Sequence, residues 1–330
     1  MSRVPQELDA LEEEAVPRVI VGRSQWQIFW RRFLRERVAL AGAGFIVVLI
    51  ALVLIAPLMT RFVVHHGPND RFSATIDDIG LPVVGPSREF WFGVDKVGRD
   101  VFVRTLYGAR TSLLVAILGT GISFAIGTVL GVVAGFFGRW ADTVISRSID
   151  VVLSLPLLLI AIGLAATCSV TARGCLGGLI HPGVWLVVSI ISVATWPFSA
   201  RIVRAFTLSI KEAQYIEAAR SIGAGNVRIM FREVLPNLVL PIIVYASLTI
   251  PTNILFESTL SYLGVGVPQT TPSWGRMISD ATSGQLYTAA WWVLLFPGTF
   301  LVLTTLAFNL LGDGLRDALD PNSVGRRSPT

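Results

Sequence analysis

Long apolar stretches without formal charge recur six times along the chain. Asp, Lys and Arg each cost about 2.5–3.5 kcal/mol at the centre of a membrane-spanning helix, so such stretches mark candidate spans. A helix needs roughly 17–25 predominantly apolar residues to cross a bilayer. The pattern predicts one helix in each of residues 38–60, 111–138, 151–172, 184–200, 234–256 and 281–312.

These stretches predict an all-α, polytopic membrane protein with about six transmembrane helices. The predicted order is a cytoplasmic N-terminal tail with an interfacial helix (1–37), a first transmembrane helix (38–62), an outer loop (63–110), a five-helix core (111–312) containing a cytoplasmic loop at 205–237, and a cytoplasmic C-terminal tail (313–330). Glycines and a proline in residues 174–183 predict a loop before the fourth helix.

The segment before the first span interleaves aromatic residues with arginines. An acidic cluster at residues 12–14 precedes the basic run, and the apolar stretch that follows is too long for a signal peptide. Trp26, Trp30 and Phe33 among the arginines suggest an amphipathic helix in the membrane interface. A basic juxtamembrane segment whose aromatic residues only anchor the chain is the alternative.

Composition supports the membrane assignment, and charge orients the chain. Only 15% of the residues are charged and 53% are hydrophobic, whereas soluble domains carry about 25% charged residues. The side that holds both termini carries twice as many basic residues as the other side, which predicts cytoplasmic termini. The net charge of +5 is then explained by anionic lipid headgroups, without a nucleic-acid partner.

Residues for catalysis or metal binding are scarce. The only lysines, Lys96 and Lys211, lie outside any G-x-x-x-x-G-K-[S/T] P-loop, so we expect no ATP hydrolysis by this chain. The three histidines form no H-E-x-x-H motif, and we expect no metal site. The adjacent pair His65 and His66 could bind a metal weakly; a solvated loop is the alternative.

Cys168 and Cys175 are the only cysteines, and both fall in the predicted outward loop between the third and fourth spans. An oxidising compartment would allow a disulfide that closes this loop. Two free thiols near the membrane interface are the alternative.

The predicted cytoplasmic loop at 205–237 contains the most informative pattern. Helix-forming residues continue to Ile222, and Gly223 can take the left-handed conformation that ends a helix. A second short helix should follow, ending at Pro236, with apolar residues at helical spacing: Val227, Met230, Phe231 and Val234. The small residues Ala218, Ala219 and Gly223 would allow a partner to approach closely. A surface helix that packs only on its own bundle is the alternative.

Several motifs resemble those of one transporter family. The sequence EAARSIG at 217–223, continued by LPN at 235–237, resembles the EAA loop with which permeases of ABC importers dock on their ATPase subunits. Further matches to the dipeptide/oligopeptide/nickel group are FGVDKVGRDV at 92–101, YGARTSL at 107–113, ESTLSYLGVGV at 257–267, PSWG at 272–275 and NLLGDGLRDALDP at 309–321. The last is typical of the C-type permease. Departures are Glu233 where the family often has His, and Tyr262 where Phe is common.

The resemblance implies a type I importer permease of the bacterial inner membrane, with peptides as cargo. Its implied partners are a second, B-type permease, two ATP-binding subunits and an extracytoplasmic substrate-binding protein. ATP and Mg²⁺ would be bound by the partners, with no cofactor in this chain. The residues implied in ATPase coupling are Glu217, Ala218, Ala219, Arg220 and Gly223. The cargo stays open among dipeptides, oligopeptides, glutathione-like peptides and nickel.

Two further groups of polar residues are candidate sites. Asn253, Glu257 and Asn309 in the last two spans are pore or gate candidates, because polar groups there usually face the bundle interior or water. Alternatively, Glu257 lies at headgroup level and Asn253 bonds across helices. The outer residues 95, 99 and 100 are candidates for contact with the binding protein, unless they are simply solvated; they are Asp95, Arg99 and Asp100.

Other functions fit the sequence less well. A proton- or ion-coupled carrier, the alternative function, should show several intramembrane carboxylates and inverted repeats. The predicted spans contain almost no carboxylates, and no repeat is evident. A membrane-embedded enzyme would need a nucleophile and base pair, and none is identifiable.

Overall fold

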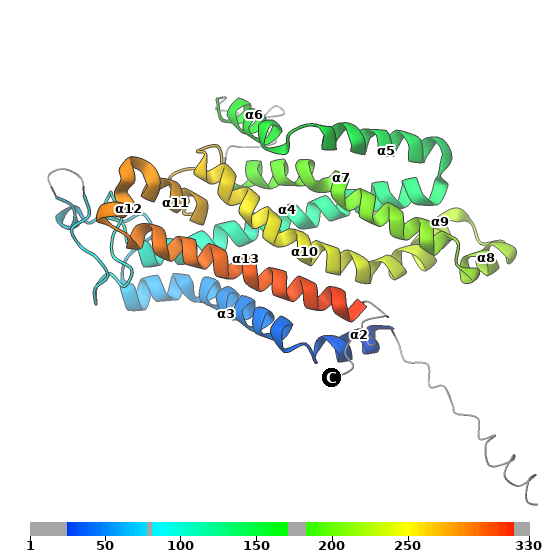
Figure 1. The fold of residues 1–330 in the computed structure, drawn as a ribbon, viewed down its shortest axis with the longest axis horizontal. Helices are drawn as coiled ribbons and strands as arrows, with labels where there is room; N and C mark the ends of the chain where they lie inside the picture. The colour runs from blue at the N-terminus through cyan, green and yellow to red at the C-terminus, as the bar shows by residue number, and fades with distance from the viewer. Residues whose placement is uncertain (1–24, 78–80, 171–182, 320–330) are drawn as a thin grey trace, which may run out of the picture.

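The computed structural model describes residues 25–77, 81–170 and 183–319, and this part of the chain is a bundle of helices without strands (Figure 1). Its main helices are α2 (Gln25–Phe33), α3 (Arg37–Met59), α4 (Val101–Phe137), α5 (Arg139–Ser154), α6 (Leu157–Val170), α7 (Val184–Lys211), α8 (Gln214–Ser221), α9 (Asn226–Ile229), α10 (Leu235–Tyr262), α11 (Trp274–Thr282), α12 (Leu286–Ala289) and α13 (Trp292–Leu319). The long helices α3, α4, α7, α10 and α13 run along the long axis, with α8 and α9 at one end and α11 and α12 at the other (Figure 1).

The number of membrane spans agrees with the sequence prediction, except for the shape of the third. Five helices of the described chain are long and apolar enough to cross a membrane, or six if the bent pair of α5 and α6 is one span. The single helix predicted at 151–172 is wrong, because the chain bends by 83° between α5 and α6. Pro156 explains the break: Leu155 before it is extended (φ −88°, ψ 138°), as residues preceding proline prefer.

Charged residues do not end the helices where the sequence placed the boundaries. The outer loop predicted at 63–110 is too long, because α4 already begins at Val101, with Asp100 accepting the N–H groups of Phe102 and Val103 at 2.8 and 3.3 Å. With 37 residues α4 is roughly 55 Å long, whereas the hydrocarbon core is about 30 Å thick. Similarly, α7 continues beyond residue 200 to Lys211 and α13 beyond 312 to Leu319. Charges therefore mark the limits of the apolar window, while the helices project beyond it.

A glycine seam joins α4 to α7. Gly127, Gly131 and Gly135 are four residues apart, so they lie on one face of α4. A Cβ atom at any of them would lie 2.5–2.7 Å from atoms of α7. Ser199 faces Gly127 at one end of the seam, and Thr207 faces Gly135 at the other end. Residue numbers therefore increase in the same direction along both helices, and the two helices run parallel. Such G-x-x-x-G spacing permits close helix packing in membranes and was a signal available in the sequence.

The N-terminal helix α2 exists as predicted for the interfacial segment. The rings of Phe29 and Phe33 are buried in an apolar cluster with Leu315 and Ala318 of α13, whereas Trp30 is about half exposed (49%). Helix α2 is thus tied to the end of α13 by one face and leaves an aromatic residue free for the membrane interface.

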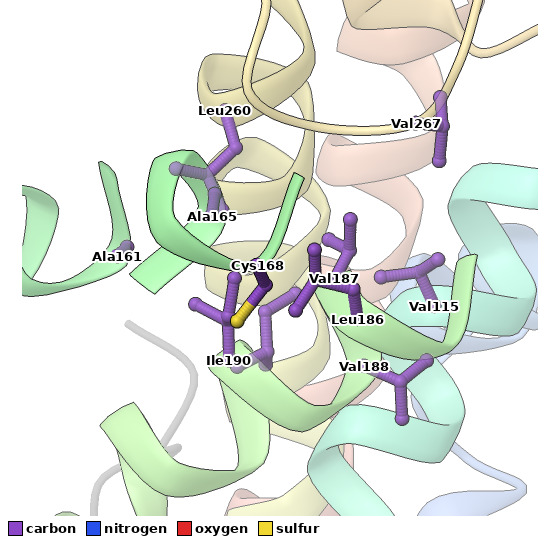
Figure 2. Packing of buried hydrophobic residues seen from close by; sticks show 11 residues of the cluster. Val115, Ala161, Ala165, Cys168, Leu186, Val187, Val188, Ile190, Leu260 and Val267 are labelled. Carbon is purple, nitrogen blue, oxygen red and sulfur yellow. The ribbon is translucent and has the colours of Figure 1, made fainter. Parts of the chain in front are cut away.

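Helix α6 packs on α7 through small residues and Cys168, as Figure 2 shows. Ala161, Ala165 and Cys168 lie in the same apolar cluster as Val187 and Ile190 of α7. Cys168 is disulfide-bonded. Cys175, the other cysteine of the chain, lies outside the described residues, so the predicted pairing stays a prediction.

Candidate coupling site and outer polar clusters

Helix α8 projects from one end of the bundle and is held there by one buried side chain. Ile216 is fully buried, and it joins an apolar cluster built from the adjoining ends of α4, α7 and α10. The other buried members are Val132, Phe136, Val203, Ile229, Val234 and Leu238. Because the anchor is apolar and shared by three long helices, α8 is attached to all of them at once. Ile216 was not among the residues predicted for coupling, although an isoleucine beside small residues in a short helix is a usable signal for a packing face.

The predicted coupling residues lie mostly on the free side of α8. Glu217, Ala218, Arg220 and Gly223 are exposed. Ala219 is half-buried and packs against the apolar cluster that surrounds Ile216, so it belongs to the anchor as well. The guanidinium of Arg220 lies 5.9 Å from the centroid of the Phe136 ring, a cation–π distance that links α8 back to α4.

Gly223 ends α8 in a Schellman motif. Its φ of +84° is left-handed, as predicted, and its N–H donates to the carbonyl of Arg220 at 2.9 Å. The N–H of Ala224 donates to the carbonyl of Ala219 at 3.0 Å, and both alanines pack on the apolar cluster. These two bonds satisfy carbonyls at the helix end and fix the direction of the chain that leaves it. Apart from its chain neighbours, no described residue has an atom within 4 Å of the position of a Cβ on Gly223, so its surroundings are open.

The segment after Gly223 joins the next long helix without a stop at Pro236. A π-helical turn (Met230–Val234) connects α9 to α10, and the N–H of Leu235 donates to the carbonyl of Met230. The predicted end at Pro236 is wrong, because Pro236 lies in the first turn of α10, where a missing N–H has little effect. The π-turn also changes the predicted apolar face: Val234 is buried together with Ile229, five residues before it.

The apolar side chains of α8, α9 and the π-helical turn that do not enter the buried cluster form an exposed apolar surface around the tip of α8. It consists of Tyr215, Ile222, Val227 and Phe231, of which Ile222 is the most exposed at 82%. Burial and the nearby Glu233 carboxylate raise the pKa of Tyr215 above its usual value. An apolar hollow of about 170 Å³ extends this surface along α4; it is lined by Thr128, Val129, Val132, Val133, Met230, Phe231 and Leu235. Exposed apolar patches of this kind mark sites that contact another protein or the membrane.

The three pore or gate candidates lie in different environments. Glu257 is fully buried and accepts hydrogen bonds from the hydroxyls of Ser112 at 2.8 Å and Ser261 at 2.7 Å. Asn253 is fully buried and donates to Thr120 Oγ1 of α4 at 2.8 Å, which is the cross-helix bond of the alternative interpretation. Only Asn309, on α13, is exposed among the three. Within the described residues, Glu257 and Asn253 connect helices, and their role at a pore or gate stays a prediction.

The outer residues predicted to contact a binding protein are buried. Asp95, Arg99 and Asp100 are 4%, 8% and 0% exposed. Arg99 Nε donates to Asp95 Oδ2 at 2.7 Å, and Asp100 caps α4. His66 lies 3.0 Å from Asp100 through Nδ1, so this histidine is buried and paired, while His65 is exposed. The three side chains offer no free surface in this structure and instead fix the outer segment to α4. In the described part of the chain, no group of three His, Cys, Asp or Glu residues could hold a metal.

Comparison with known proteins decides the family. The family described as binding-protein-dependent transport system inner membrane component matches residues 127–324, which include the whole of α8 and α10. The chain belongs to this family. Residues 24–77 match the N-terminal transmembrane domain of oligopeptide transport permease C, and this range contains α2 and α3.

Relatives match this permease over most of its length. It is 40% identical to the glutathione transport system permease protein GsiD of Pectobacterium atrosepticum, over 91% of this chain and 92% of the relative. It is 39% identical to the dipeptide transport system permease protein DppC of Bacillus subtilis, over 90% and 86% of the two chains. An inward-facing structure of the MetNI methionine ABC transporter shares the fold, with a TM-score of 0.52 and 19% identity, covering 64% of this permease and 94% of that chain.

Proposed function

We propose that this permease is one half of the translocation pathway of an ATP-driven importer of peptides. The relatives named as dipeptide and glutathione permeases support a peptide cargo. The observation that carries the coupling role is the geometry of α8: a helix with an exposed tip and a single buried anchor shared by α4, α7 and α10. A force applied to that tip is transmitted to three long helices at once.

The proposed assembly contains a second, B-type permease, two ATP-binding subunits and an extracytoplasmic binding protein. ATP and Mg²⁺ belong to the ATP-binding subunits, since this chain has no P-loop. Both termini and α8 face the cytoplasm, as the distribution of basic residues predicts. Closure of the ATPases would move α8 as a rigid body and bias the helices between inward-facing and outward-facing states, because only differential contacts shift such an equilibrium.

Gly223→Asp tests the coupling role. An L residue at φ +84° is strained, and the Schellman motif that sets the exit of α8 is disturbed. We expect the variant to insert and to assemble, with ATP hydrolysis retained and peptide uptake reduced at least about tenfold. The readouts are uptake of a labelled dipeptide into proteoliposomes and ATP hydrolysis by the same preparation.

Gly225→Asp is the matched control. Gly225 is also exposed and has open space around it, but its φ of −72° accepts any residue, and Asp is a favourable N-cap for α9. Normal uptake by the Gly223→Asp variant would contradict the coupling role. If the permease purified without ATPases and transported under a proton gradient without ATP, the carrier alternative would replace the proposed function.

A further inference from the structure

A buried ionic cluster lies at the end of the bundle opposite α8, where the outer segment meets the start of α4 and α11 (Figure 1). Asp95 Oδ2 lies 2.7 Å from Arg99 Nε and 3.7 Å from Arg104 Nε. Asp280 of α11 lies 3.2 Å from Lys96 Nζ and 3.5 Å from Arg99 Nη2. The sixth member, Arg276, approaches Asp280 at 3.9 Å.

The cluster is not electrically balanced. Four cations, Lys96, Arg99, Arg104 and Arg276, share the two carboxylates of Asp95 and Asp280. Asp100 belongs to a separate group, because its carboxylate is used by His66 and by the first N–H groups of α4. Among the described residues, the cluster therefore keeps two positive charges without counter-charge, and a charge removed from water without a partner is unfavourable by several kcal/mol.

The unused hydrogen-bond donors belong to the same cations. The Arg104 side chain is 1% exposed; its Nη1 donates to the carbonyl of Pro68 at 2.9 Å, while Nε and Nη2 have no hydrogen-bond partner among the described residues. Arg276 Nε is likewise buried without a hydrogen-bond partner in the described chain. Buried donors are satisfied in the great majority of protein sites, so the unused Nε of Arg276, beside excess positive charge, indicates an acceptor that the described residues do not supply.

We infer that this cluster is a carboxylate-binding site, completed by an acidic side chain of the substrate-binding protein. The inference rests on the proposed function, which places a binding protein at this end. Access fits that direction: Lys96 is 36% exposed at its side chain, Arg276 and Asp280 are 14% exposed, and Arg104 is innermost. A carboxylate arriving from outside meets Lys96 and Arg276 first, and Arg104 adds long-range attraction from below. Complementary charge of this kind chiefly sets the rate and specificity of docking.

The test measures the dissociation constant of the purified binding protein on the complete transporter in nanodiscs, at several salt concentrations. We expect Lys96→Gln and Arg276→Gln each to weaken docking about five- to tenfold and to flatten its dependence on salt. Arg71→Gln, at an exposed arginine of the same outer segment, is the control and should dock like the unchanged protein. Asp280→Asn should strengthen docking, because it removes a competing carboxylate; a purely structural role for the ion pairs predicts weakening.

The outcomes separate this inference from the proposed function. If no binding protein docks on the unchanged complex, the proposed function fails; if it docks and Lys96→Gln and Arg71→Gln bind it equally, only this inference is overturned. Loss of the second permease from the Lys96→Gln complex would also overturn it, since the carboxylate would then come from that subunit. Binding of a dipeptide, but not of its C-terminal amide, to the complex without binding protein would assign the site to the cargo and overturn the assigned source.

Discussion

Both ends of the bundle are attached to the long helices by apolar clusters, but buried side-chain hydrogen bonds add to the packing at the α11 end. At the α8 end the attachment is apolar, with Ile216 in a cluster and two alanines beside it. At the α11 end, Met277 and Ala281 also pack in an apolar cluster with Val293 of α13. Directional polar contacts are added there: Trp274 is fully buried and donates from Nε1 to the carbonyl of Thr105 at 3.1 Å. A Cβ atom on Gly275 would overlap the backbone of Ser258, so α11 also touches α10 directly. Apolar contacts tolerate small rotations, whereas oriented hydrogen bonds in a dry site favour one geometry.

Glu257 is the centre of the polar attachment. Its two carboxylate oxygens accept from Ser112 on α4 and Ser261 on α10, and Ser258 lies 3.4 Å from the same carboxylate. Ser273, which caps α11, lies close to this carboxylate. Three helices therefore meet at one side chain. The α11 end is therefore held in one geometry by oriented hydrogen bonds, whereas α8 lacks such buried side-chain hydrogen bonds among the described residues and has more freedom to rotate.

The largest effect on the heat stability of the whole chain is expected for Glu257→Leu, which removes the buried polar connection near α11. Removal of the carboxylate leaves the hydroxyls of Ser112 and Ser261 buried without their acceptor, and each such group costs about 1–3 kcal/mol. We expect a loss of stability on the order of 3 kcal/mol, measured as a lower midpoint of heat-induced aggregation in detergent. Glu257→Gln keeps one acceptor oxygen and should lose less. Equal heat stability of the Leu variant and the unchanged protein would contradict the role of Glu257 as a connection between helices.

Ile216→Ala should weaken the attachment of α8 and leave the attachment of α11 unchanged. Truncation of a fully buried isoleucine costs about 2–5 kcal/mol, here confined to the attachment of α8. We expect the amides of α8 to exchange hydrogen faster by at least about tenfold while those of α11 keep their rates, and peptide uptake to fall. Ile222→Ala, at a side chain that is 82% exposed, is the control and should leave exchange in α8 unchanged. Faster exchange in α11 as well would show that the two ends are not independent.

The sequence predicted the parts of the structure that depend on local chemistry. The left-handed conformation of Gly223 followed from the absence of a Cβ, and the spans followed from the cost of charge in hydrocarbon. Tertiary contacts decided the rest. The charged side chain of Arg104 is buried in a helix because Asn69 and Pro68 supply acceptors from 35 or 36 residues away. Proline had opposite effects at two places: the helix ends before Pro156, whereas it continues through Pro236. Only Pro236 follows a π-helical turn, which already holds the preceding residues in helical geometry.

The smallest effect is expected for Arg220→Gln, which tests whether the α8 end contains any directional contact. Arg220 and Lys211 both lie about 6 Å from the ring of Phe136, at 5.9 and 6.0 Å. A cation–π contact of an exposed arginine is worth about 0.5–1 kcal/mol, so Arg220→Gln should speed hydrogen exchange in α8 by only about two- to fivefold. Arg228→Gln removes an exposed arginine without such a contact and should change nothing in α8. If Arg220→Gln loosened α8 as much as Ile216→Ala, the attachment would be as directional as that of α11, and the contrast between the two ends would disappear.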